Sequence, residues 1–271
     1  MAMRAGALAV TFCLLVISTS RALAQAPDTI FLEELTWTEL RELIQSGKTT
    51  VIVPTGGTEQ NGPHMALGKH NLRVKVLSEK IARALGNALV APVLAYVPEG
   101  RLSPPTGHMR FVGTITTPDD VFQKLLEAAA GSFKRHGFRD VVFLGDHGSS
   151  QAGQKAAAAR LNREWAATPV RAHAIEEYYR TSDVEFRQML KTLGYREEEL
   201  GTHAGLTDTS LMLAVEPRFV RAGRLRPGSG SRDGDGVAGD PTRASSELGR
   251  LGVDLIVSRT VDAIKTSIAR R

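Results

Sequence analysis

The chain has 271 residues, of which 42% are hydrophobic and only 6% are aromatic, and this is enough apolar material for one globular core. Its formal net charge is +5. The basic residues are scattered rather than interleaved with aromatic residues along one stretch, which argues against nucleic-acid binding. The only cysteine is Cys13. It lies in the N-terminal apolar segment. A chain that has lost this segment has no cysteine left, which excludes catalysis by a thiol.

The N-terminus has the pattern of a secretory signal peptide. A short basic start, MAMR, precedes the apolar run AGALAVTFCLLVIS and the cleavage-type sequence Ala22-Leu23-Ala24. We therefore expect a signal peptide over residues 1–24, cleavage after Ala24, and a mature chain of residues 25–271 that is secreted or periplasmic. The alternative is an N-terminal membrane anchor, but the apolar run is short for a bilayer span. After cleavage we expect no membrane association.

Apolar runs and helical periodicities alternate along the rest of the chain. The runs predict strands at 50–54, 88–94, 140–145 and 170–175. The periodic segments predict helices at 36–47, 71–86, 118–136, 150–167 and 205–217, and from about 243 to the end. This alternation predicts a single α/β domain with three α/β/α layers and a Rossmann-like, mostly parallel sheet. We expect the segments 96–113 and 176–202 to be loops that determine specificity.

Polar side chains follow two of these predicted strands. Glu59 and His70 come after the first strand, in GTEQNGPHMALGKHN, and Asp146 and His147 come after the third. Sites in open parallel sheets form beyond the carboxyl ends of the strands. We therefore expect the two clusters to converge, although about 80 residues separate them.

Glu59, His70 and His147 provide one carboxylate and two imidazoles. This is the ligand set of a catalytic centre that leaves a position open for water. Such a set suits zinc first, and also iron, manganese or nickel. The alternative is that these are capping or surface residues of glycine-rich loops. His136, at a helix end, and His173, within a strand, are expected to be structural.

Five ordered segments of the chain resemble the creatininase (creatinine amidohydrolase) family. They are VPTGGTEQNGPHMALGKH (53–70), HMRFVGTITTP (108–118), HGFRDVVFLGDHGSS (136–150), HAGLTDTSLMLAVEP (203–217) and GVAGDPTRASSELG (236–249). The resemblance implies a Rossmann-like subunit that commonly assembles as a homohexamer. It also implies a divalent-metal site that activates water to open a C–N amide or related bond of a small molecule.

The chain departs from the family pattern at three metal positions. Asn61 stands where the family has a histidine, His70 replaces the aspartate that bridges two metals, and Ser149 replaces a glutamate. The resemblance therefore implies that one metal position survives, with Glu59, His70 and His147 as its ligands. We expect one divalent metal per subunit, or an asymmetric site in which a second metal binds weakly.

The resemblance also implies roles for other polar residues. Asp208 corresponds to a family glutamate and is expected to act as a base or as a fourth ligand. His203 is expected to donate a proton to the leaving nitrogen or to hold a substrate oxygen. The following residues are expected to bind substrate or to orient the metal ligands: Asn61, His64, His108, Asp146 and Ser149.

These observations predict an exported, metal-dependent amidohydrolase of the creatininase type that acts on a small amide or cyclic amide. The alternative is a non-catalytic relative that binds a metal or a small ligand. Retention of Glu59, His70, His147 and His203 favours the enzyme, because a purely structural protein does not need these residues.

Overall fold

The computed structural model describes residues 27–228 and 234–270. The expected signal peptide and its cleavage site lie outside these residues, and so does part of the glycine-rich segment near residue 230. Within the described ranges, no helix is both long enough and apolar enough to cross a membrane.

A parallel four-stranded sheet forms the centre of the described domain. The strands are β1 (Thr50–Thr55), β2 (Ala88–Val90), β3 (Asp140–Gly145) and β4 (Arg171–Ala174), in the order β2-β1-β3-β4. Every residue of β1 and β3 is buried, as expected for central strands that are covered on both faces. The predicted strands and the parallel sheet are confirmed.

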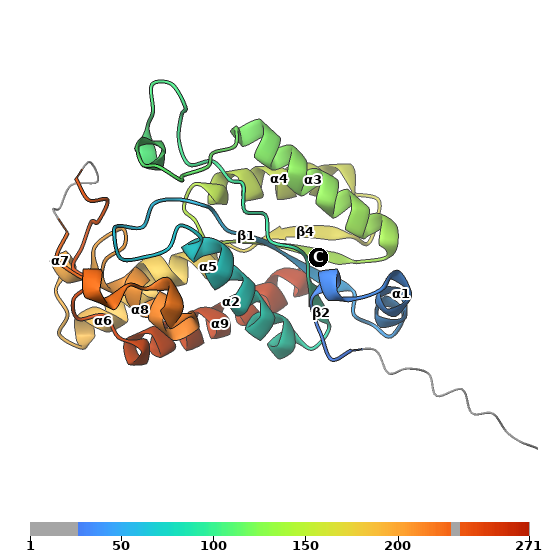
Figure 1. Ribbon diagram of the computed structural model, residues 1–271. Coiled ribbons are helices and arrows are strands. Elements are labelled where there is room, and N and C mark those ends of the chain that lie inside the picture. Colours follow the sequence, from blue (N-terminus) through green and yellow to red (C-terminus); the bar gives the residue numbers. More distant parts are fainter. Residues whose placement is uncertain (1–26, 229–233, 271) are drawn as a thin grey trace, which may run out of the picture.

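Helices cover both faces of the sheet. The helices α3 and α4 lie on one face, and α2 and α9 lie on the other, where α8 packs against α9 (Figure 1). This arrangement confirms the predicted single three-layer α/β domain. The helices are α1 (Trp37–Gln45), α2 (Lys69–Leu85), α3 (Asp119–His136), α4 (Ser150–Glu164), α5 (Glu177–Arg180), α6 (Phe186–Thr192), α7 (Glu197–Leu200), α8 (Leu206–Val215) and α9 (Ser246–Ala269). Short turns are η1 (Leu32–Glu34), η2 (Gly107–Arg110), the π-helical η3 (Thr181–Glu185), η4 (Pro217–Phe219) and η5 (Ala222–Arg224).

The expectation of a loop at 176–202 was wrong. Most of this segment is helical, from α5 through η3 and α6 to α7. Phe186 and Leu190, four residues apart, are fully buried in the main core. The π-helical turn and Gly194 divide the segment into short pieces, so no piece is long enough to show a clear helical period.

The sheet register places the two polar segments side by side. Thr55, the last residue of β1, pairs with Gly145, the last residue of β3. The chain therefore leaves both strands at the same edge, and residues 56–68 lie next to residues 146–149. The expected convergence of the two clusters is confirmed.

Candidate active site

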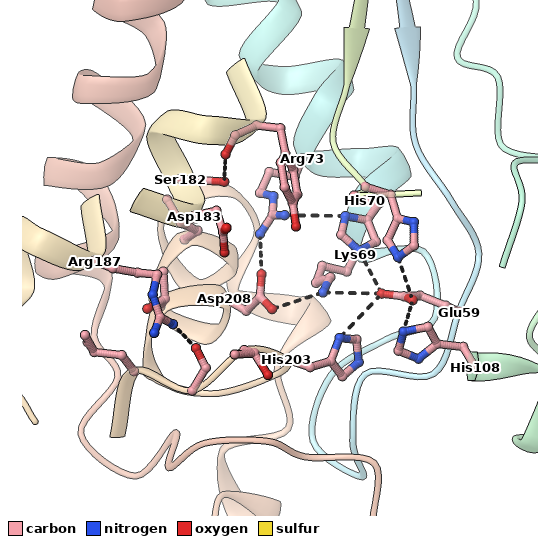
Figure 2. Close-up of a pocket in the computed structure, with 18 residues that line it drawn as sticks. Glu59, Lys69, His70, Arg73, His108, Ser182, Asp183, Arg187, His203 and Asp208 are labelled. Carbon is pink, nitrogen blue, oxygen red and sulfur yellow. Dashed lines mark hydrogen bonds and ion pairs between the residues drawn. The ribbon is translucent and has the colours of Figure 1, made fainter. Parts of the chain in front are cut away.

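Glu59 is the central residue of the site, and its carboxylate is fully buried. Its two oxygens face different groups. Oε2 lies 3.0 Å from Nε2 of His108 and 3.1 Å from Nε2 of His147. Oε1 lies 2.8 Å from Nε2 of His70 and 3.6 Å from Nζ of Lys69 (Figure 2). One carboxylate therefore connects two polar groups of side chains.

Glu99 joins the site from the segment between β2 and α3. An antiparallel bridge between Thr58 and Ile115 holds this segment beside Glu59, and the Glu99 amide donates to Oγ1 of Thr116 at 2.9 Å. Gly57 makes the approach possible. A Cβ atom at Gly57 would lie 2.7 Å from Oε1 of Glu99, and the φ of +151° also disfavours other residues.

Glu59, Glu99, His108 and His147 each offer one ligand atom, and these four atoms all lie within 4.8 Å of one another. Oε2 of Glu59 and both oxygens of Glu99 are buried, and imidazole nitrogens of His108 and His147 lie 3.0 to 3.3 Å from the Oε2 atoms. Carboxylate oxygens are rarely buried in this way unless a cation or a proton compensates them. The donor set of two carboxylates and two imidazoles suits zinc or a related divalent ion.

The electrostatics of these groups agree with a cation site. Burial and the neighbouring charge of Glu59 raise the pKa of Glu99 to about 9, so a proton compensates the pair when no metal is bound. Burial lowers the pKa of His147, which keeps this imidazole neutral and able to act as a ligand. Burial alone would raise the pKa of Glu59, but His70 and His147 hold it well below its usual range.

Neighbouring groups orient the two candidate imidazole ligands. Nδ1 of His147 lies 2.6 Å from Oγ of Ser149, whose hydroxyl donates to the carbonyl of Pro98. Nδ1 of His147 also accepts from the Ser149 amide at 3.3 Å, and these contacts hold the ring with Nε2 directed at the carboxylates. Nε2 of Gln60 lies 3.0 Å from Nδ1 of His108, while Oε1 of Gln60 accepts from the Gly62 amide at 2.9 Å.

His70 contacts the other oxygen of Glu59, and its ring packs edge-on against His147, with ring centroids 5.0 Å apart. Its Nε2 contacts Glu59, and its Nδ1 lies 2.5 Å from Oδ1 of Asp146. Asp146 in turn accepts from Arg73 and from the hydroxyl of Tyr178, at 2.6 Å. Both ring nitrogens of His70 thus contact carboxylates, and the ring positions Glu59. The structure brings together the three ligands predicted from the sequence, but Glu99 and His108 lie closer to the candidate metal position than His70 does.

His203 presents an acceptor to the site. Its Nε2–H donates to the carbonyl of Gln60 at 2.9 Å, which leaves the lone pair on Nδ1, 3.8 Å from Oε1 of Glu59. Burial and the nearby Lys69 ammonium lower its pKa to about 3. At neutral pH the ring is therefore neutral, accepts through Nδ1, and directs its one proton, on Nε2, at the Gln60 carbonyl.

Asp208 lies in the first turn of α8, away from the four candidate ligands. Its Oδ1 accepts from Arg73 at 2.9 Å, and its Oδ2 accepts from Lys69 at 3.3 Å and from the Ala204 amide at 3.0 Å. The carboxylate therefore holds two cations in place.

Asn61 and His64 support the loop that carries Glu59. The Asn61 amide donates to the carbonyls of Glu59 and Ala66, at 2.9 and 3.1 Å. Nε2 of His64 lies 3.1 Å from Oγ1 of Thr209, which ties the loop to α8. Neither residue lines the pocket described next.

A pocket of about 250 Å³ opens beside the cluster. Glu59, His108 and His147 line one end, and Lys69 and Asp208 line the middle (Figure 2). The other end is polar and is formed largely by η3, α6 and the chain before α8. Its lining includes Tyr179, Ser182, Asp183, Arg187 and Thr202.

The sequence did not single out Glu99, Lys69 or Arg73. Lys69 stands directly before His70, and Arg73 follows His70 by three residues. This spacing places Arg73 on the same helix face as His70, so the sequence did contain a signal for Arg73. Glu99 lies in a loop without periodicity, and no pattern connects it to Glu59.

The fold and the site define an α/β protein with a candidate single-metal centre at the carboxyl edge of a parallel sheet. The family model described as creatinine amidohydrolase, or creatininase, matches residues 33–264. The chain belongs to this family.

Three relatives and one solved structure illustrate the similarity. The creatinine amidohydrolase of Pseudomonas putida is 26% identical over 253 residues, which cover 87% of this chain and 96% of that protein. A 3-dehydro-scyllo-inosose hydrolase of Thermotoga maritima is 26% identical over 72% of this chain and 59% of that protein. A mycofactocin precursor peptide peptidase of Mycobacterium tuberculosis is 26% identical over 252 residues, which cover 84% of this chain and 87% of that protein. A creatininase crystal structure is 25% identical, with a TM-score of 0.73 over 89% of this chain and 98% of the other. These relationships make the chain a hydrolase.

Proposed function

We propose that the chain is a divalent-metal-dependent amidohydrolase that cleaves a C–N amide or cyclic amide bond of a small molecule. One observation carries the proposal. Oxygens of Glu59 and Glu99 are buried close together, next to two imidazole nitrogens at the end of a polar pocket. Two carboxylates buried this close together need a cation or a shared proton, and the imidazole nitrogens beside them complete a ligand set for a divalent ion.

Glu59, Glu99, His108 and His147 would hold the metal. When bound, a divalent ion of this kind lowers the pKa of water and makes hydroxide available near neutral pH. His70 orients Glu59, and Ser149 orients His147. These contacts fix the ligands before substrate enters.

Groups of the chain around the pocket would bind the substrate. Nδ1 of His203 accepts a hydrogen bond from the attacking water or from a substrate N–H. Lys69 places a positive charge beside Glu59 and can donate to a substrate oxygen. Ser182, Asp183 and Arg187 give the far end donors and acceptors, and the small volume suits a compact polar amide.

Two properties of the protein outside the active site are part of the proposal. The N-terminal pattern supports export to the periplasm or the medium. Leu102 and Val112, on the segment that projects between β2 and α3 (Figure 1), are 72% and 100% exposed, which supports assembly into a homo-oligomer.

The proposal predicts hydrolysis that depends on metal. We expect the purified protein to hydrolyse at least one member of a panel of small linear and cyclic amides, including creatinine. Stripping with a chelator should lower the rate at least about 100-fold, and added zinc or manganese should restore it. Circular dichroism checks that the stripped protein stays folded. Tight retention of a panel compound without turnover, in fully loaded protein, would instead support a binding protein.

A further inference from the structure

Lys69 is a buried cation that contacts the oxygen of Glu59 facing away from His108 and His147. Its side chain is only 1% exposed, although lysine is rarely buried. Nζ donates to Oδ2 of Asp208 at 3.3 Å and lies 3.6 Å from Oε1 of Glu59. Figure 2 shows the ammonium between these two carboxylates, at the wall of the pocket.

The position that Lys69 occupies has the surroundings of a cation site. Oε1 of Glu59 and Oδ2 of Asp208 approach it from two sides, and the His70 ring lies against the same Glu59 oxygen. Arg73 holds Asp208 through the other oxygen, at 2.9 Å, so that this carboxylate stays turned towards Lys69. The surrounding groups therefore attract a cation independently of the Glu99 side of the site.

We propose that Lys69 acts as the second cation of the active site. Its ammonium lies between Glu59 and Asp208, where its charge opposes a second divalent ion beside Glu59, and it thereby limits the chain to one metal ion. The inference rests on the proposed metal-dependent function and adds the residue that sets the metal stoichiometry. An ammonium suits this task because it is a compact point charge with rotatable donors, whereas a metal ion has to find a complete ligand set.

The test counts zinc ions bound by the full chain, using calorimetric titration with Zn²⁺ and elemental analysis. We expect one equivalent for the wild-type protein. Lys69→Glu should bind two equivalents, because a carboxylate then joins Glu59 and Asp208 around the vacated position. Lys69→Gln, which only removes the charge, should bind the first ion about tenfold tighter or more, because a positive charge next to a metal-binding carboxylate is lost.

Lys80→Glu is the matched control, because Lys80 lies on the exposed side of the same helix and the change in net charge is identical. It should bind one equivalent with unchanged affinity. If Lys69→Glu still binds one ion and Lys69→Gln binds it no tighter, the role of Lys69 is overturned while the metal site stands. Two equivalents in the wild-type protein would also overturn it. Absence of zinc binding in every variant would overturn the proposed function as well.

Discussion

Glu59→Gln should abolish high-affinity metal binding and hydrolysis. The substitution keeps the shape of the side chain but removes its negative charge. This charge faces His108 and His147 through one oxygen and His70 and Lys69 through the other. Because Glu59 contacts His108 and His147 through one oxygen and His70 through the other, no other carboxylate can replace it. We expect zinc affinity to fall by more than about 100-fold, which exceeds the usual cost of losing a residue that only orients a ligand.

Isothermal titration with zinc and the amide assay measure this effect. Glu42→Gln, an exposed position on α1, is the control and should change neither quantity. The far-UV spectrum of Glu59→Gln should match the wild type, since the variant removes a buried charge and leaves the loop hydrogen bonds of Asn61 intact. A Glu59→Gln protein with wild-type zinc affinity would contradict the site.

Arg73→Met should cause the largest loss of stability. The guanidinium is 4% exposed and bridges the buried Asp146 and the partly buried Asp208, with Nη2 at 2.7 Å from Asp146 and Nη1 at 2.9 Å from Asp208. Removing it takes the main counter-charge from Asp146, and from Asp208 it takes one of two cations, with Lys69 remaining. Breaking a buried ion pair in this way costs about 3–5 kcal/mol. Urea unfolding of metal-free protein gives the value.

The pH dependence of this loss follows from Asp146. Burial opposes its ionisation, but Arg73 and His70 hold its pKa well below the usual range. A carboxyl with a depressed folded-state pKa contributes stability at neutral pH and loses it as the pH falls through that lowered value. The difference between wild type and Arg73→Met should therefore be full at pH 7 and shrink in strong acid.

Arg83→Met on the same helix provides the comparison. Arg83 is 46% exposed and pairs with Glu79 one turn away. Exposed pairs of this kind contribute about 0–1 kcal/mol, so this variant should unfold close to the wild type. Equal losses for Arg73→Met and Arg83→Met would show that the buried network contributes little.

The sequence predicted the sheet well because its strands are short apolar runs bounded by glycine, proline and charged residues. The helix α1 was also clear, since Thr36 and Glu39 form the predicted capping box. In contrast, α5 to α7 were missed because each is one or two turns long, and short helices owe their stability to tertiary packing rather than to local pattern.

The part of the site that follows the predicted strands could also be predicted. Glu59, His70 and His147 follow strands whose ends must meet, so their proximity could be inferred from the chain order. Glu99 depends on a bridge between Thr58 and Ile115, and such loop contacts leave no periodic trace. The sequence also could not show that Asp146 and Glu59 use both nitrogens of His70.

The position of the metal is the central claim, and anomalous diffraction from zinc-loaded crystals tests it most directly. Data collected on both sides of the zinc absorption edge locate the ion without reference to any variant. The expected result is one peak per chain, enclosed by Oε2 of Glu59, Glu99, His108 and His147. A peak bonded to Nε2 of His70, or no peak among these four residues, would contradict it.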